Sequence, residues 1–143
     1  MGVLASIIDK SISGSFSSDA SSVGDAAFRG CSNLSSVSFP NVTRVFDDAF
    51  RACEGLTTAS FPKLTRIDPG RSSRVSKSGA FYNCVNLTTL YIGTKNSTVC
   101  ELGDGAFQGC SNLANIYVPA SLVDVYKSDS GWHSYANRIK AAP

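Results

Sequence analysis

The chain has few of the side chains from which catalytic and metal sites are built. Its only histidine is His133, beside Trp132, and a histidine in this position is read as a surface residue of a terminal cap rather than as a general base. The cysteines include no C-x₂-C pair, the spacing that brings thiolates together around zinc. The glycines follow an internal repeat and do not form the G-x-G-x-x-G segment of a phosphate loop. We therefore predict no enzymatic activity, no metal and no cofactor.

Strong charge and long apolar runs are also missing. A formal net charge of +2 over 143 residues gives no concentrated basic face, so a nucleic-acid partner is not expected. No apolar run approaches the roughly 18 residues needed to cross a bilayer, so a membrane span is not expected either. Residues 1–10 lack the basic start of a secretory signal and meet Asp9 after a short apolar stretch. The length suits one domain, residues 1–143.

What the chain does have is an internal repeat. The block A-F-x-x-C-x-x-L occurs four times, at residues 27–34, 49–56, 80–87 and 106–113. Successive phenylalanines of the block are separated by 22, 31 and 26 residues. A supersecondary unit repeated at this spacing is typical of a solenoid, in which each coil buries its apolar face against its neighbours.

Each block leads into a short strand pattern. Two apolar residues follow at a spacing of two, which predicts a strand with one buried face. Proline ends three of these strands, at Pro40, Pro62 and Pro119, and Gly93 ends the other. We expect an irregular return leg after each strand, then a corner, then a short helical or 3₁₀ turn that carries the Ala-Phe pair into the core.

Cys31, Cys53, Cys84 and Cys110 occupy the same place in successive blocks. They are therefore predicted to stack along the solenoid as buried, reduced thiols, because a small apolar side chain suits such a position. Cys100 stands outside this register, and the sequence leaves its exposure open.

The two ends of the chain depart from the repeat. Residues 1–26 are predicted to be an N-terminal cap and a degenerate first repeat, in which Leu4, Ile7 and Ile8 form an amphipathic turn and Ile12 and Phe16 a weak strand. Residues 27–119 hold the four repeats. Residues 120–143 are predicted to be a helical C-terminal cap with two apolar helix faces, which are Leu122, Val125 and Tyr126, and then Trp132, Tyr135 and Ile139.

The repeated pattern A-F-x-x-C-x-x-L-x-x-V-x-F-P-x-V-T-x-V resembles the BspA-like (Treponema pallidum-type) leucine-rich repeats of bacterial surface proteins and of phage or prophage proteins. The resemblance runs from Ile12 to about Leu122. The predicted fold is a leucine-rich-repeat solenoid of about four to five coils, mainly β with short helical or 3₁₀ turns, closed by a C-terminal helical cap. The resemblance implies recognition or adhesion through protein or glycan contacts.

The outward strand positions form the first candidate binding surface. They are expected to line up in two columns, one of Ser36, Thr58, Thr89 and Asn115, the other of Ser38, Ser60, Tyr91 and Tyr117. Tyrosine combines a large apolar ring with a polar tip, which suits an interface. A simple cross-strand tyrosine pair that only stabilises the sheet is an equal alternative.

The second candidate is a nine-residue insertion within residues 68–79. It carries the cations Arg71, Arg74 and Lys77 and follows Arg66. Arginine side chains fit carboxylates and phosphates, while a solvated loop without a ligand is the alternative.

The favoured hypothesis is a non-enzymatic module that recognises a protein partner with the sheet face and the loop at 68–79. The alternatives are a phage-encoded inhibitor of a host protein, a glycan-binding adhesin, and a structural segment of a phage tail or surface protein; a homo-oligomer is also compatible. The expected location is the cytoplasm, including that of a phage-infected host, or a virion or cell surface.

Overall fold

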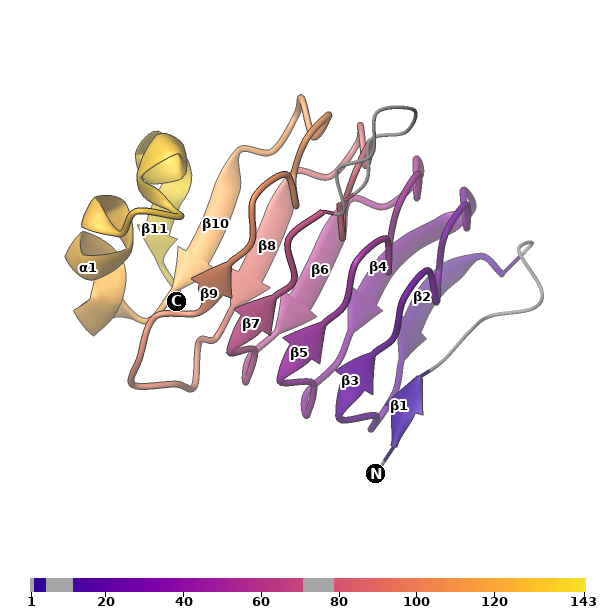
Figure 1. Cartoon of the computed structure of the whole chain (residues 1–143), viewed down its shortest axis with the longest axis horizontal. Helices are drawn as coiled ribbons and strands as arrows, with labels where there is room; N and C mark the ends of the chain where they lie inside the picture. Colours follow the sequence, from indigo (N-terminus) through magenta and orange to yellow (C-terminus); the bar gives the residue numbers. More distant parts are fainter. Residues whose placement is uncertain (1, 5–11, 71–78) are drawn as a thin grey trace.

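The computed structural model describes residues 2–4, 12–70 and 79–143. Within these residues the chain winds as a solenoid whose two walls are parallel β-sheets (Figure 1). The large sheet has six strands, in the spatial order β2 (Gly14–Ser17), β4 (Leu34–Ser38), β6 (Thr58–Phe61), β8 (Thr89–Ile92), β10 (Asn115–Val118) and β11 (Ile139–Ala141). The predicted solenoid fold is confirmed.

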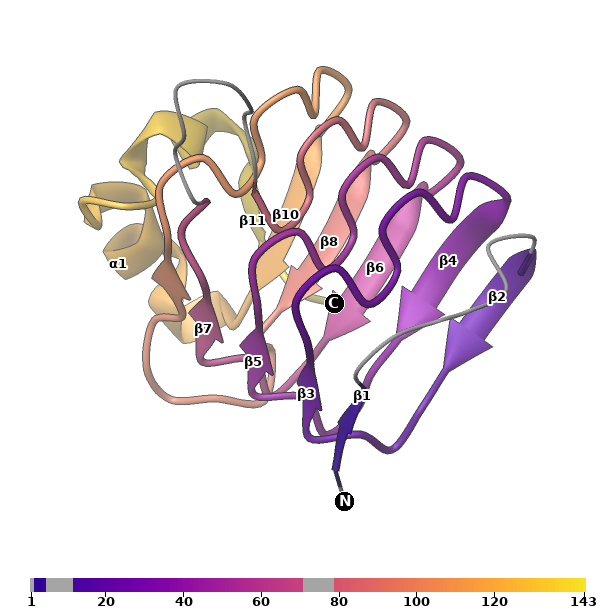
Figure 2. The ribbon, with the colours of Figure 1, turned by 45° about the vertical axis from the view of Figure 1, so that its right-hand side comes forward.

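The small sheet is formed by the return legs, which the sequence analysis expected to be irregular. Its five strands of two residues each are β1 (Val3–Leu4), β3 (Ser22–Val23), β5 (Arg44–Val45), β7 (Arg66–Ile67) and β9 (Glu101–Leu102). Figure 2 shows it as a separate wall facing the large sheet. That expectation was wrong because the coils stack in register, so the return legs of adjacent coils also come within reach of parallel hydrogen bonding.

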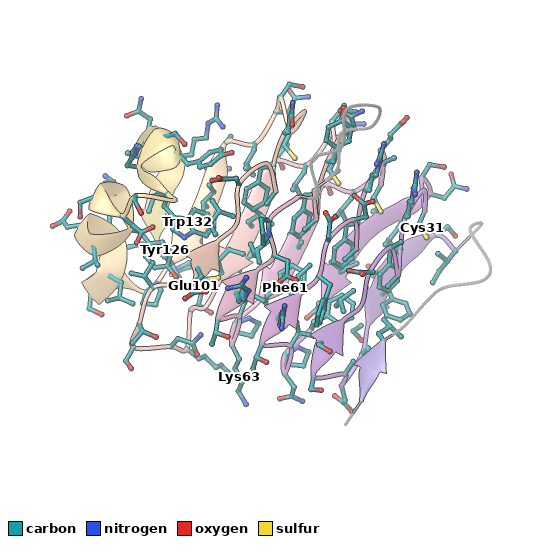
Figure 3. The ribbon with its side chains drawn as sticks, in the orientation of Figure 1. Cys31, Phe61, Lys63, Glu101, Tyr126 and Trp132 are labelled. Carbon is teal, nitrogen blue, oxygen red and sulfur yellow. The ribbon has the colours of Figure 1, made fainter. Side chains whose placement is uncertain are left out.

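Two stacks of phenylalanine rings fill the space between the walls. In the first, ring centroids are 5.1 Å apart from Phe28 to Phe50, 5.1 Å from Phe50 to Phe81 and 5.3 Å from Phe81 to Phe107. In the second, the Phe39 and Phe61 rings stack at 5.6 Å, and Figure 3 shows Phe61 between the two sheets. These rings are buried, so each coil buries its apolar face against its neighbours, as the repeat predicted.

The cysteine stack is buried as predicted, and its thiols also make hydrogen bonds. Cys53, Cys84 and Cys110 each donate from Sγ to the carbonyl oxygen of the phenylalanine one coil earlier, over 3.0, 3.0 and 3.1 Å. Hydrogen bonding with the thiols of Cys110 and Cys53, together with burial, raises the pKa of Cys84 well above its usual value. The buried thiol therefore stays protonated and serves as a donor between coils.

The Ala-Phe segment forms a succession of turns rather than a helix. Bonds of 3₁₀ type close it, such as Arg29 N–H to Ala26 O and Cys31 N–H to Phe28 O. The residue before each cysteine has a left-handed backbone, with φ of +75° at Gly30, +58° at Ala52, +58° at Asn83 and +85° at Gly109. Its N–H points to the next coil, as in the 2.7 Å bond from Ala52 N–H to Tyr82 O. Glycine suits this position best.

The two ends differ in part from the prediction. Leu4 lies in β1, which pairs with β3, and not in an amphipathic turn; Ile7 and Ile8 lie outside the described residues. Phe16 lies in β2 as expected. At the other end, the cap contains η1 (Ala120–Leu122), α1 (Val123–Ser128), η2 (His133–Arg138) and then strand β11.

Two details of the predicted cap helices were therefore wrong. Val125 is 49% exposed, and the half-buried Val123 packs on the core in its place. Ile139 is buried in β11 and not on a second α-helix. The reason is that β10 would otherwise be an unpaired sheet edge, and a parallel strand satisfies its backbone groups.

We predict that Ala52→Gly stabilises the protein by about 0.5–1 kcal/mol, because the left-handed conformation strains alanine and not glycine. Urea unfolding monitored by circular dichroism measures the change. The matched control is Ala49→Gly in the same turn, where the native residue is buried without positive φ, and it should lose about 1 kcal/mol. Equal losses in both variants would contradict the left-handed assignment.

Candidate functional site

The predicted surface residues lie on the outer face of the large sheet. Strand register places Ser36 beside Thr58, Thr58 beside Thr89 and Thr89 beside Asn115. The second column runs in the same way through Ser38, Ser60, Tyr91 and Tyr117. The structure thus brings these eight residues onto one continuous face; their role in binding stays a prediction.

Both columns extend beyond the residues that the sequence analysis named. Ser15 and Ser17 of β2 lie beside Ser36 and Ser38. At the other end Lys140 of β11 lies beside Tyr117, and its Nζ donates to Oδ1 of Asn115. Lys140 was not predicted on this face because residues 120–143 were expected to form a helical cap. For Ser15 and Ser17, the sequence signal was their position on either side of the apolar Phe16, which is the alternation of a strand with one buried face.

Tyr91 and Tyr117 form the largest feature on this face. Their ring centroids lie 5.0 Å apart with an interplanar angle of 22°, so the rings stack along the column. Both side chains are half-buried. Because tyrosine is much larger than serine or threonine, the pair Tyr91 and Tyr117 forms a step on this face beside the hydroxyl side chains of β2, β4 and β6.

The C-terminal cap is fastened to the solenoid through the backbone of one residue, Cys100. The backbone N–H of Cys100 donates to Oη of Tyr126 over 2.9 Å, and Nε1 of Trp132 donates to the carbonyl oxygen of Cys100 over 2.7 Å. Trp132 and Tyr126 pack edge to face at 5.5 Å, at the C-terminal end of the solenoid in Figure 3. This contact orients the segment that leads to β11 and Lys140. Cys100, whose exposure the sequence left open, is buried.

Arg66 lies on the small sheet and not beside the tyrosines. Its Nε donates to Oδ1 of Asp68 over 3.0 Å and its Nη1 to Oε2 of Glu101 over 2.7 Å. Arg44 also binds Asp68: its Nε and Nη2 donate to Oδ1 and Oδ2 of that residue, each over 2.9 Å. Burial alone would raise the pKa of Asp68, but the hydrogen bonds from both arginines hold it below its usual range. Arg66 is thus part of an ion-pair ladder.

The remaining predicted site residues, Arg71, Arg74 and Lys77, lie outside the described residues. An open depression of about 580 Å³ lies between β7, β9 and the cap, and Pro69, which precedes the insertion in the sequence, is part of its lining. Its polar lining includes Arg66, Glu101 and Asp129, of which Arg66 and Glu101 pair with each other and Asp129 accepts the N–H of Gly131. These three side chains therefore have partners within the chain, and the exposed Asp104 adds a further carboxylate to the lining.

Two absences can be stated for the described part of the chain. No group of three His, Cys, Asp or Glu side chains within it is placed to hold a metal ion. None of its helices is both long enough and apolar enough to cross a membrane.

The two sheets, the repeated turns and the stacked rings define a leucine-rich-repeat solenoid. The family described as BspA type Leucine rich repeat region (6 copies) matches residues 9–70 and 22–129. The match covers most of the chain, and the chain belongs to this family. No curated protein and no solved structure gives a match. Leucine-rich repeats of this kind are typically non-enzymatic and generally mediate protein or surface recognition.

The cap contact predicts a loss of stability at alkaline pH. Burial raises the pKa of the Cys100 thiol to about 12, and burial likewise raises the pKa of Tyr126 to about 12. The unfolded chain releases these protons near the ordinary values of 9.0 and 10.0. The unfolded state then binds fewer protons than the folded state, so the free energy of unfolding falls as pH rises from about 9 to 12.

Urea unfolding at pH 7, 9, 10 and 11 measures this profile. Cys100→Ala is the matched control, since the backbone N–H and C=O of residue 100 keep both hydrogen bonds to the cap. The variant should show a shallower alkaline loss than the native chain. A stability that is flat above pH 9, or identical slopes for both proteins, would contradict the assigned burial of this thiol.

Proposed function

We propose that the chain is a non-enzymatic recognition module that binds a protein partner through the outer face of the large sheet. The observation that carries the proposal is the stacked pair Tyr91 and Tyr117, held side by side on a face lined by hydroxyl side chains. Ring-bearing side chains that are already ordered lose little conformational entropy on binding. A partner therefore meets a preformed surface.

The size of the face limits what it does alone. Six strands at about 4.8 Å spacing give a strip about 24 Å long and roughly 10 Å wide, which is a few hundred Å². A standard protein interface buries about 800 Å² on each side. Adjacent segments must then contribute, and Arg71, Arg74 and Lys77 in the 68–79 insertion remain the proposed addition. Both a surface adhesin and an inhibitor of a host protein would bind their partner with the sheet face and the insertion. Identifying the bound partner distinguishes these two functions.

We predict that the double variant Tyr91→Ala/Tyr117→Ala weakens partner binding at least about 100-fold, because interface tyrosines often contribute about 2 kcal/mol or more each. Partners are captured from a cell extract with the immobilised chain and purified. Calorimetry then measures their affinity for the native chain and for the double variant. The control is Tyr82→Ala, a half-buried tyrosine on the Ala-Phe turns that packs on Arg51 at 5.0 Å. Unchanged affinity in the double variant, with unchanged thermal unfolding, would overturn the proposed surface.

The insertion is tested separately with Arg71→Ala/Arg74→Ala. If these arginines pair with acidic groups of the partner, the variant should weaken binding by about tenfold and flatten the dependence of affinity on salt. An affinity and a salt dependence equal to those of the native chain would limit the interface to the sheet face.

A further inference from the structure

We propose that the chemical group recognised on this face is a saccharide ring, which stacks on Tyr91 above the hydroxyl side chains of β6 and β4. The inference rests on the proposed function, since it names the part of the partner that the same face contacts. It follows from three features: the step that Tyr91 and Tyr117 form, the hydroxyl side chains of β6, β4 and β2 beside that step, and the area which those hydroxyl side chains cover. We call this hydroxyl surface the floor.

The two sides of the Tyr91 ring have different neighbours. Tyr117 covers one side of the Tyr91 ring at 5.0 Å. The opposite side faces β6, where the register partner of Tyr91 is Ser60. A serine side chain ends at Oγ and is too short to cover an aromatic ring. The Tyr91 ring therefore forms a wall beside a lower floor, and the C–H groups of a sugar ring pack well on such an apolar, electron-rich face.

The floor is made entirely of hydroxyl-bearing side chains. It consists of Ser60 and Thr58 on β6, Ser38 and Ser36 on β4, and Ser17 and Ser15 on β2. Each hydroxyl both donates and accepts hydrogen bonds, and so does each hydroxyl of a sugar. Oγ of Ser36 donates to Oγ of Ser15 over 3.0 Å, so these two hydroxyls partly satisfy each other. An apolar protein segment laid on this floor would deprive the other hydroxyls of the hydrogen bonds that water gives them, which is costly. Serine is depleted in protein interfaces, and serine and threonine are under-represented among their hot spots.

The area of the floor fits one small group on the partner and not a whole protein interface. Three strands at about 4.8 Å and two columns about 7 Å apart give a floor of about 100 Å². This is far below the roughly 800 Å² that one side of a standard protein interface buries, and it matches about two or three sugar rings. None of the floor residues is ionisable, so an uncharged sugar ring suits the floor. Lys140, whose Nζ donates to Oδ1 of Asn115, places one positive charge beyond Tyr117.

The test begins with a panel of immobilised, chemically defined di- to hexasaccharides, neutral and acidic, probed with the full chain. The strongest binder is then titrated in soluble form into the ¹⁵N-labelled protein. The expected result is a set of amide shifts centred on Ser60, Thr58, Ser38 and Tyr91. Binding to no saccharide of the panel, or shifts confined to other parts of the chain, overturns the inference.

Variants assign the contact to the step. Tyr91→Ala should weaken the saccharide at least tenfold, whereas Tyr91→Phe keeps the ring face and should stay within about twofold. Ser60→Val removes a floor hydroxyl with a residue that favours strands, so the fold is kept and affinity should fall several-fold. Tyr82→Ala should have no effect. Equal affinity in Tyr91→Ala and the native chain overturns the inference.

A last comparison separates this inference from the proposed function. The captured protein partner is tested before and after enzymatic removal of its glycans. Loss of binding on deglycosylation supports the saccharide contact. Unchanged binding that still depends on Tyr91 and Tyr117 overturns the saccharide contact and leaves the protein-recognition function standing. Binding that depends on neither tyrosine overturns both.

Discussion

The structure depends on one constraint, which is that equivalent residues of successive coils lie in register. A parallel stack gives every coil the same neighbours, so a phenylalanine, a cysteine thiol or a turn N–H meets its counterpart one coil away. The two sheets, the ring stacks and the bonds across the Ala-Phe turns are consequences of this register. An insertion is accepted only where it leaves the register intact, as between Gly70 and Gly79, on either side of which pairing continues from β7 to β9 and from β6 to β8.

The same register produces the candidate binding surface. Any residue that faces outward on one strand lies beside its equivalent on the next, so two tyrosines in adjacent coils must stack and a series of serines must form a floor. The end of the array then matters because β10 needs a partner. The cap supplies β11, and its Tyr126 and Trp132 bond to the backbone N–H and C=O of Cys100. This strand also brings Lys140 to the end of the face.

The internal positions could be predicted from sequence because the repeat alone determines them. The burial of Phe28, Phe50, Phe81 and Phe107 and the alignment of the two outward columns needed only the spacing of the block. The ends could not be predicted in this way. Val125, Ile139 and Lys140 lie where no further repeat follows, so their environment depends on how the last sheet edge is satisfied. The small sheet was missed because two-residue strands carry almost no periodic signal.

The central claim is that adjacent coils are coupled through stacked rings, and a double-mutant cycle tests it most directly. The free energy of unfolding is measured for Phe50→Leu, Phe81→Leu and the double variant, and for Phe28→Leu, Phe107→Leu and their double variant. Stacked rings at 5.1 Å predict a coupling energy of about 0.5–1.5 kcal/mol for Phe50 and Phe81. The pair from the two ends of the stack should be additive within about 0.5 kcal/mol. Additivity in both pairs, or equal coupling in both, would contradict the account.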